Sequence, residues 1–157
     1  MFTNLAPGGS PGQRARDNHF MGHSFTSNFV HLVFSTKHRR GLIPQNKLND
    51  TWEYVSGVAR HHGIRPVIAG GTRNHLHLLL ILPAAMSVAD AARLVKANSS
   101  KWLREEVKDF DWQEGYGAFS VSPPHAERVV EYIRNQEEHH RKRSFEEEFA
   151  IMLKQCG

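Results

Sequence analysis

The sequence predicts an α+β fold: a ferredoxin-like βαββαβ antiparallel sheet with an added C-terminal helix. Four short segments carry alternating or continuous apolar residues, which is typical of strands. Two longer segments between them repeat apolar residues every three or four positions, which is typical of amphipathic helices. Their order along the chain is that of the split βαβ motif. We therefore expect one antiparallel sheet with two helices on one of its faces.

Three strands and one helix are predicted in the first half of the chain. The helix places Leu48 and Trp52 on one face, and Gly63 follows it as a C-cap. A glycine-rich turn at residues 70–74 joins the second strand to the third. In order, we expect a strand at residues 24–36, a helix at about 45–62, a strand at 67–69 and a strand that begins at His75.

The second half is predicted to add a helix, a short strand and two further helices. Ser87 is a good N-cap, because its hydroxyl can accept a hydrogen bond from the first helical turn. Pro123 and Pro124 favour a helix start, because proline is tolerated in the first turn. In order, we expect a helix at about 88–107, a strand at 118–122, a helix from Pro123 to about His140 and a helix at about 144–154.

Length and composition indicate one domain. Residues 1–22 are rich in Gly, Pro, Asn and Arg without periodicity, so we expect a flexible tail before a single domain at 23–157. The formal net charge of +4 permits a phosphate-rich partner. The single cysteine, Cys156, excludes a disulfide within the chain and a cysteine-based zinc site. Without an apolar run of membrane-spanning length or a signal core, we expect a cytoplasmic protein with no membrane partner.

Two histidines in the third predicted strand are the first candidates for chemistry. His75 and His77 precede a continuous apolar run, and alternation along a strand places both on one face. Burying two neighbouring imidazoles costs free energy unless something binds them. Neutral imidazole is a common ligand of divalent metals. The motif alone leaves two interpretations open: a metal site, or histidines that only form local hydrogen bonds.

Tyr132 and Gln136 are the second candidates. They are four residues apart in one predicted helix, so we expect them to share a face. That face flanks the apolar stripe of the same helix, where a side chain can point toward a site. Periodicity alone also permits a half-buried tyrosine and a solvated glutamine.

Four segments together resemble a known family. In chain order they are His31 to Arg40, His75-Leu-His77, Trp112 to Ser122, and Tyr132-Ile-Arg-Asn-Gln136. Over residues 24–142 the chain resembles the single-tyrosine HUH transposases of small bacterial insertion sequences, which move as single-stranded DNA.

The resemblance implies a DNA transposase that cleaves and rejoins single-stranded DNA at hairpin-marked ends through a 5′-phosphotyrosine. It makes Tyr132 the nucleophile, and His75, His77 and Gln136 the protein ligands of a divalent metal. Two imidazoles and an amide oxygen form a weak site, suited to Mg²⁺ or Mn²⁺. The implied partners are single-stranded DNA with hairpin ends and a second copy of the chain. In that homodimer the active sites are shared in trans, with a hinge expected at the loop of Gly115 and Gly117.

Basic residues are candidates for contacts with the DNA backbone. They are Lys37, Arg39 and Arg40 in one turn, Arg93, Lys96, Lys101 and Arg104 on the second helix, and Arg141, Lys142 and Arg143 after the tyrosine helix. Such residues position a phosphate backbone and do not by themselves read sequence. For each of them a solvated charge is the alternative.

Rival functions fit less well. A histidine-triad nucleotide hydrolase needs a third histidine where this chain has Leu79, and a two-histidine RNA phosphoesterase needs two separated His-x-Ser/Thr motifs that we do not find. The alternative that stays open is a domesticated relative that binds hairpin DNA, such as a transposase associated with repetitive palindromes, with altered or lost cleavage.

Overall fold

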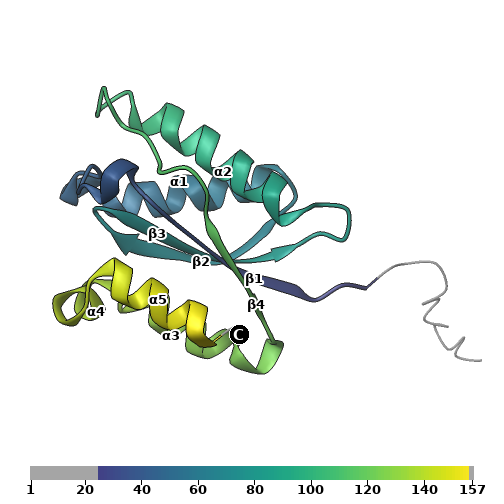
Figure 1. The fold of residues 1–157 in the computed structure, drawn as a ribbon. Helices are drawn as coiled ribbons and strands as arrows, with labels where there is room; N and C mark the ends of the chain where they lie inside the picture. Colours follow the sequence, from purple (N-terminus) through teal and green to yellow (C-terminus); the bar gives the residue numbers. More distant parts are fainter. Residues whose placement is uncertain (1–24, 156–157) are drawn as a thin grey trace, which may run out of the picture.

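The computed structural model describes residues 25–155. The predicted tail at residues 1–22 and Cys156 lie outside the described residues. Figure 1 shows a sheet with helices on both sides, so the described chain forms three layers. No helix within residues 25–155 is both long and apolar enough to cross a membrane.

The sheet has four strands, β1 (Asn28–Ser35), β2 (Arg65–Thr72), β3 (His75–Leu82) and β4 (Gly117–Val121). Their order is β2-β3-β1-β4, and every neighbouring pair is antiparallel. This is the order of the ferredoxin-like βαββαβ motif, so the predicted fold class is confirmed. Strand β3 begins at His75 as predicted, and the other predicted strand ends differ by one to four residues, as expected where only the apolar pattern defines the boundary.

Helices α1 (Leu48–His61) and α2 (Val88–Leu103) cover one face of the sheet, as predicted (Figure 1). Ser87 caps α2, because its hydroxyl accepts a hydrogen bond from the Asp90 backbone N–H at 3.0 Å. The core between the helices and this face is apolar. It contains Val30, Leu32 and Phe34 of β1, Leu76, Leu78, Leu80 and Leu82 of β3, and Val55, Ala91 and Val95 of the two helices.

The other face is covered by three helices from the C-terminal part of the chain, α3 (Ala126–Arg134), α4 (Gln136–Lys142) and α5 (Phe145–Gln155). Short 3-10 turns complete the described elements at Lys37–Arg39, Gln45–Lys47 and Pro123–His125. The predicted pair of helices on one face therefore describes only half of the arrangement, because the added helices cover the second face.

The predicted single helix from Pro123 to His140 is wrong in one respect. It is interrupted at Asn135, whose φ of −97° and ψ of 21° are not helical, so Tyr132 belongs to α3 and Gln136 begins α4. Asparagine is a poor residue for a helix interior because its side chain competes for backbone hydrogen bonds. The break changes the direction of the chain beside the sheet while it keeps Gln136 buried.

A glycine allows α3 to approach the sheet closely. A Cβ on Gly70 of β2 would lie 2.8 Å from both the carbonyl oxygen and the Cγ2 atom of Ile133. Such contacts are too short for any other residue, so Gly70 permits the position of the last turn of α3. This turn carries Tyr132 and leads directly into Gln136.

Candidate active site

The register of β3 places His75 and His77 on the face that α3, α4 and α5 cover. Val33 and Ser35 of β1 are their direct cross-strand partners, so His31, two residues before Val33, lies on the same face. Neither His75 nor His77 is exposed to solvent, and His31 is only 5% exposed. The sheet thus gathers three buried imidazoles beneath the added helices.

His75 uses one ring nitrogen to hold its orientation and presents the other to the site. Its Nδ1 lies 2.8 Å from Asn74 Oδ1 and 3.0 Å from Thr72 Oγ1. Burial lowers the pKa of His75 to about 4, so the ring is neutral near pH 7 and carries one N–H. Because Asn74 Oδ1 can only accept, that N–H sits on Nδ1 and leaves a lone pair on Nε2.

The lone pair of His75 Nε2 faces an oxygen. Gln136 Oε1 lies 2.9 Å away, and the Gln136 amide nitrogen donates a long hydrogen bond of 3.5 Å to the carbonyl of Tyr132. Two acceptor atoms at this distance repel each other unless a cation lies between them. In an octahedral site with metal–ligand distances of about 2.1 Å, neighbouring ligands are about 3 Å apart. The pair therefore fits two ligands of one metal ion.

His77 provides the second observation that fits a metal. Its Nδ1 shares a hydrogen bond of 2.9 Å with His31 Nε2, while its Nε2 is buried without a partner. Among the described residues this is the only buried side-chain nitrogen or oxygen with no hydrogen-bond partner. Burial, with smaller effects from His75 and His31, holds the pKa of His77 well below its usual value, so the ring is available as a neutral ligand.

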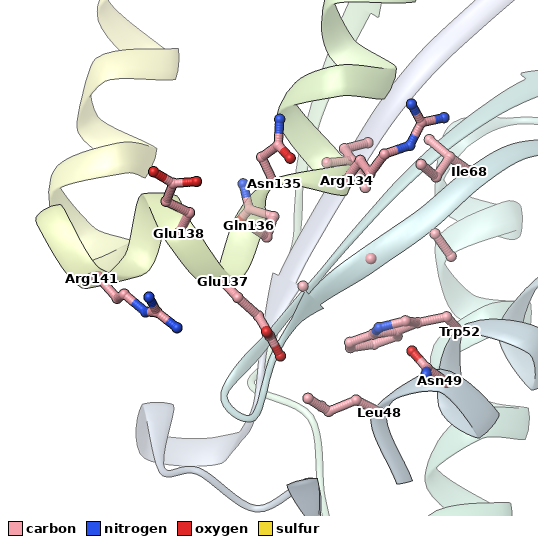
Figure 2. Close-up of a pocket in the computed structure, with 14 residues that line it drawn as sticks. Leu48, Asn49, Trp52, Ile68, Arg134, Asn135, Gln136, Glu137, Glu138 and Arg141 are labelled. Atoms are coloured by element: carbon pink, nitrogen blue, oxygen red, sulfur yellow. The ribbon is translucent and has the colours of Figure 1, made fainter. Parts of the chain in front are cut away.

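Gln136 also lines a neighbouring cavity of about 580 Å³ between α1 and α4 (Figure 2). Trp52 of α1 borders the cavity on one side, and Arg134 and Arg141 are its basic residues. Glu137 and Glu138 lie on the same rim, so the charge is mixed. This cavity is separate from the opening beside Tyr132.

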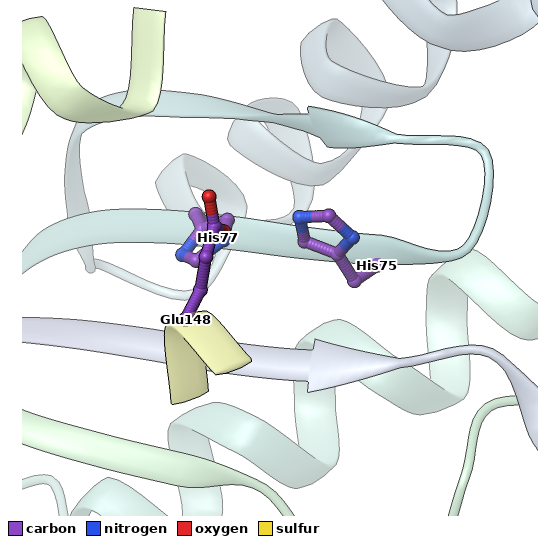
Figure 3. Close-up of side chains that lie close together, drawn as sticks. All are labelled: His75, His77 and Glu148. Carbon is purple, nitrogen blue, oxygen red and sulfur yellow. The ribbon is translucent and has the colours of Figure 1, made fainter. Parts of the chain in front are cut away.

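An acidic residue of α5 joins the two histidines. Glu148 is 5% exposed, and one of its carboxylate oxygens, His75 and His77 offer ligand atoms that all lie within 4.8 Å of one another. Figure 3 shows the Glu148 carboxylate beside the His77 ring, with His75 at the start of the same strand. Imidazole nitrogens and a carboxylate oxygen are suitable ligands for Mn²⁺.

Tyr132 lies at the edge of the same group. Its hydroxyl donates a hydrogen bond of 3.1 Å to Glu148 Oε2, and its ring packs edge-on against His77 with centroids 5.5 Å apart. Burial raises the pKa of Tyr132 to about 12. The phenol is therefore neutral at pH 7 and needs a neighbouring positive charge to become a nucleophile.

The space in front of Tyr132 is open and basic. A cavity of about 840 Å³ lies between α3, α4 and α5. Its basic lining residues are His125, Arg128, His139, Lys142 and Arg143. A polyanion could reach the tyrosine by this route.

The predicted DNA contacts lie on both sides of the sheet. Arg39 of the basic turn pairs with Glu146 of α5, so that turn lies close to the site. The four predicted residues of α2 lie on the opposite face. Among them, Arg93 pairs with Asp90, Arg104 pairs with Asp111, and Lys96 donates hydrogen bonds of 2.7 Å to the carbonyls of Gln113 and Gly115. Lys37, Arg40 and Lys101 are exposed.

Sequence reasoning missed two residues of the site. His31 begins a segment that carries the family resemblance, but only the register of β1 against β3 shows that it lies beside His77. Glu148 is one of three consecutive glutamates, and only the packing of α5 shows which of them is buried. Asn74, in the turn before β3, is bonded to the His75 ring.

Comparison with known proteins identifies the family. Residues 24–136 match the family described as "Transposase IS200 like". The chain belongs to this family. The resemblance to single-tyrosine HUH transposases is thereby confirmed, and the protein is a transposase by family.

Individual relatives agree with this. The "Transposase for insertion sequence element IS200" of Salmonella typhimurium (strain LT2) is 26% identical over 128 residues, which cover 76% of this chain and 84% of the relative. The protein of the same description from Salmonella typhi gives the same values.

Two solved structures share the fold of this transposase. One, from Deinococcus radiodurans R1 and assigned there as a transposase, has a TM-score of 0.58 and 19% identity, and covers 73% of this chain and 95% of the other. The second is a tyrosine transposase bound to a REP hairpin. It has a TM-score of 0.58 and 14% identity, and covers 77% of this chain and 73% of the other.

Proposed function

We propose that this transposase cleaves and rejoins single-stranded DNA at hairpin-marked element ends through a 5′-phosphotyrosine on Tyr132, with Mg²⁺ or Mn²⁺ at His75, His77 and Gln136. The observation that carries the proposal is the position of the Tyr132 hydroxyl. It lies beside His77 and Glu148, both buried, of which His77 Nε2 has no hydrogen-bond partner, and it faces a basic cavity. Hairpin binding is supported by the REP hairpin held by the structural neighbour.

The chemistry follows from the groups present. The phenol oxygen of Tyr132 forms a bond to phosphorus as the bond from phosphorus to the 3′ oxygen breaks. The phenol loses its proton, and the leaving 3′ oxygen gains one. A divalent ion, when bound, offsets the negative charge that develops on the phosphate oxygens. Because the phosphotyrosine conserves the ester bond, a 3′ hydroxyl can reverse the step and rejoin the strand without ATP.

The protein's own residues prepare this step. Asn74 and His31 hold the two histidines through their Nδ1 atoms, so both Nε2 atoms point toward the site. The Tyr132 carbonyl accepts from the Gln136 amide, so the nucleophile and the third ligand are joined across the break between α3 and α4. Arg128 and Arg143 line the route by which a DNA strand would arrive.

A covalent adduct tests the proposal. Protein incubated with a single-stranded DNA hairpin and Mg²⁺ should form a protein–DNA band on a denaturing gel. Tyr132→Phe should keep the fold and hairpin binding but form no adduct. The matched control is Tyr116→Phe, because Tyr116 is 42% exposed in a loop and should be dispensable. Adduct formation by Tyr132→Phe would refute the assignment, and hairpin binding without any adduct would favour the domesticated relative.

We further propose a homodimer with active sites shared in trans. Within one chain, Tyr132 already lies beside its own His77, so sharing requires α3 to α5 to dock on the partner, with the loop at Gly115 and Gly117 as the hinge. Mixing His75→Ala with Tyr132→Phe under conditions that exchange subunits should then restore cleavage. Demonstrated heterodimers without recovery would show that each site is built from one chain.

A further inference from the structure

Glu148 has no place in the motifs that identify the family. It lies on α5, beyond residue 136 where the family match ends. It is nevertheless 5% exposed, whereas the two glutamates that precede it in the sequence, Glu146 and Glu147, are exposed. A buried carboxylate costs free energy unless a positive partner compensates its charge.

Within residues 25–155 no basic side chain forms an ion pair with Glu148. Its hydrogen bond from a side chain is the one that the Tyr132 hydroxyl donates. The same carboxylate lies within 4.8 Å of the ligand atoms of His75 and His77. His77 Nδ1 is already bonded to His31, and His77 Nε2 has no hydrogen-bond partner.

We propose that Glu148 is a further ligand of the divalent metal, so that α5 completes the active site. The inference rests on the metal site of the proposed function. The full set of ligands is then His75 Nε2, His77 Nε2, Gln136 Oε1 and one Glu148 oxygen. A carboxylate has two oxygens, so one can bind the ion while the other still accepts from the Tyr132 hydroxyl. Glu148 would thereby fix the distance between the ion and the nucleophile.

Helix α5 is packed against the rest of the domain on both sides of Glu148. Phe145 is 6% exposed and its ring lies 4.7 Å from that of His75. Phe149 packs against β4, where a Cβ on Gly117 would lie 2.5 Å from the Phe149 ring. These two contacts, one on each side of Glu148, hold its carboxylate over the sheet. A negative ligand also makes the set more attractive to a hard divalent cation than two imidazoles and an amide alone.

Metal affinity without DNA tests the inference separately from cleavage. Mn²⁺ is titrated into the full chain and free Mn²⁺ is followed by electron paramagnetic resonance. Glu148→Gln and Glu148→Ala should each weaken Mn²⁺ binding tenfold or more, and Gln136→Ala should do the same. The matched control is Glu147→Gln, because Glu147 is exposed on the same helix and glutamine can keep its hydrogen bond to the Ser144 N–H. This variant should bind Mn²⁺ like the wild type.

Tyr132→Phe separates the metal role from a purely structural one. It removes the hydroxyl from Glu148 and should leave Mn²⁺ affinity within about twofold. Wild-type affinity in Glu148→Gln, or no Mn²⁺ binding by the wild type, overturns the inference. Circular dichroism checks that each variant is folded, and Glu148→Asp, which keeps the charge on a shorter side chain, should retain more affinity than Glu148→Ala. If binding depends on Glu148 but no DNA adduct ever forms, the inference stands and the proposed function fails.

Discussion

The two faces of the sheet are opposite in character although the same strands supply both. In β3, Leu76 and Leu78 point into the core beneath α1 and α2, while His75 and His77 point toward α3 to α5. Both faces are buried, but the one buried side-chain polar atom without a partner among residues 25–155, His77 Nε2, lies on the second face. The apolar face thus stabilises the domain. The polar face presents potential metal ligands, and burying them lowers the free energy of unfolding.

The largest expected effect separates catalysis from folding on the polar face. His77→Ala removes the ligand atom that lacks a partner, so cleavage should fall by roughly a thousandfold or more, which corresponds to about 4 kcal/mol of barrier. Hairpin binding should persist, because phosphate contacts elsewhere supply affinity. Single-turnover cleavage and a gel-shift titration measure the two quantities. Full activity in excess EDTA would contradict the metal role.

The adjacent position on the apolar face should behave in the opposite way. Leu78 is fully buried, so Leu78→Ala should lower the free energy of unfolding by about 2–5 kcal/mol through lost burial and a cavity. Below the unfolding temperature, metal binding and cleavage should stay close to wild type. Urea denaturation measures the loss. A stable Leu78→Ala protein with no cleavage would show that the two faces are not independent.

Much of this contrast was predictable from sequence. The alternation around His75 and His77 predicted that both share one face, and Leu76 and Leu78 predicted an apolar core on the opposite face. The fold class followed from the order of apolar periods. The way in which α3 to α5 cover the polar face was not predictable. It depends on the break at Asn135 and on the close approach of α3 that Gly70 permits. Glu148 and His31 enter through packing, which periodicity does not encode.

The stability of the domain should fall at acidic pH because of the buried histidines on the polar face. The pKa values of His31 and His75 are lowered to about 4 by burial, against 6.5 in the unfolded chain. Below pH 6.5 the unfolded chain therefore binds protons that the folded chain does not, so stability falls as pH falls toward 4. When the pH falls from 7 to 5.5, each of these histidines should lower the free energy of unfolding by about 1 kcal/mol.

The measurement is urea denaturation of the metal-free protein at both pH values. His31→Phe should lose about 1 kcal/mol less than the wild type over this interval, because one proton-binding group is gone. Leu78→Ala serves as the control, since it lowers stability but should leave the pH dependence unchanged. Equal pH dependence in His31→Phe and the wild type would mean that burial of His31 does not shift its pKa.

The smallest expected effect is on hairpin affinity, and it indicates which face of the domain contacts DNA. Lys142 lines the cavity in front of Tyr132, whereas Lys101 lies on α2, on the far side of the sheet, and both are exposed. If the strand enters by that cavity, Lys142→Ala should weaken hairpin binding severalfold and reduce the slope of log affinity against log salt concentration by about 0.7–0.9. Lys101→Ala should change neither quantity, although the basic pattern of α2 predicted a contact there.

An equal loss in both variants would mean that the hairpin wraps around to α2, because each phosphate contact contributes independently of its distance from the nucleophile. The polar face would then hold the chemistry without holding the whole DNA interface.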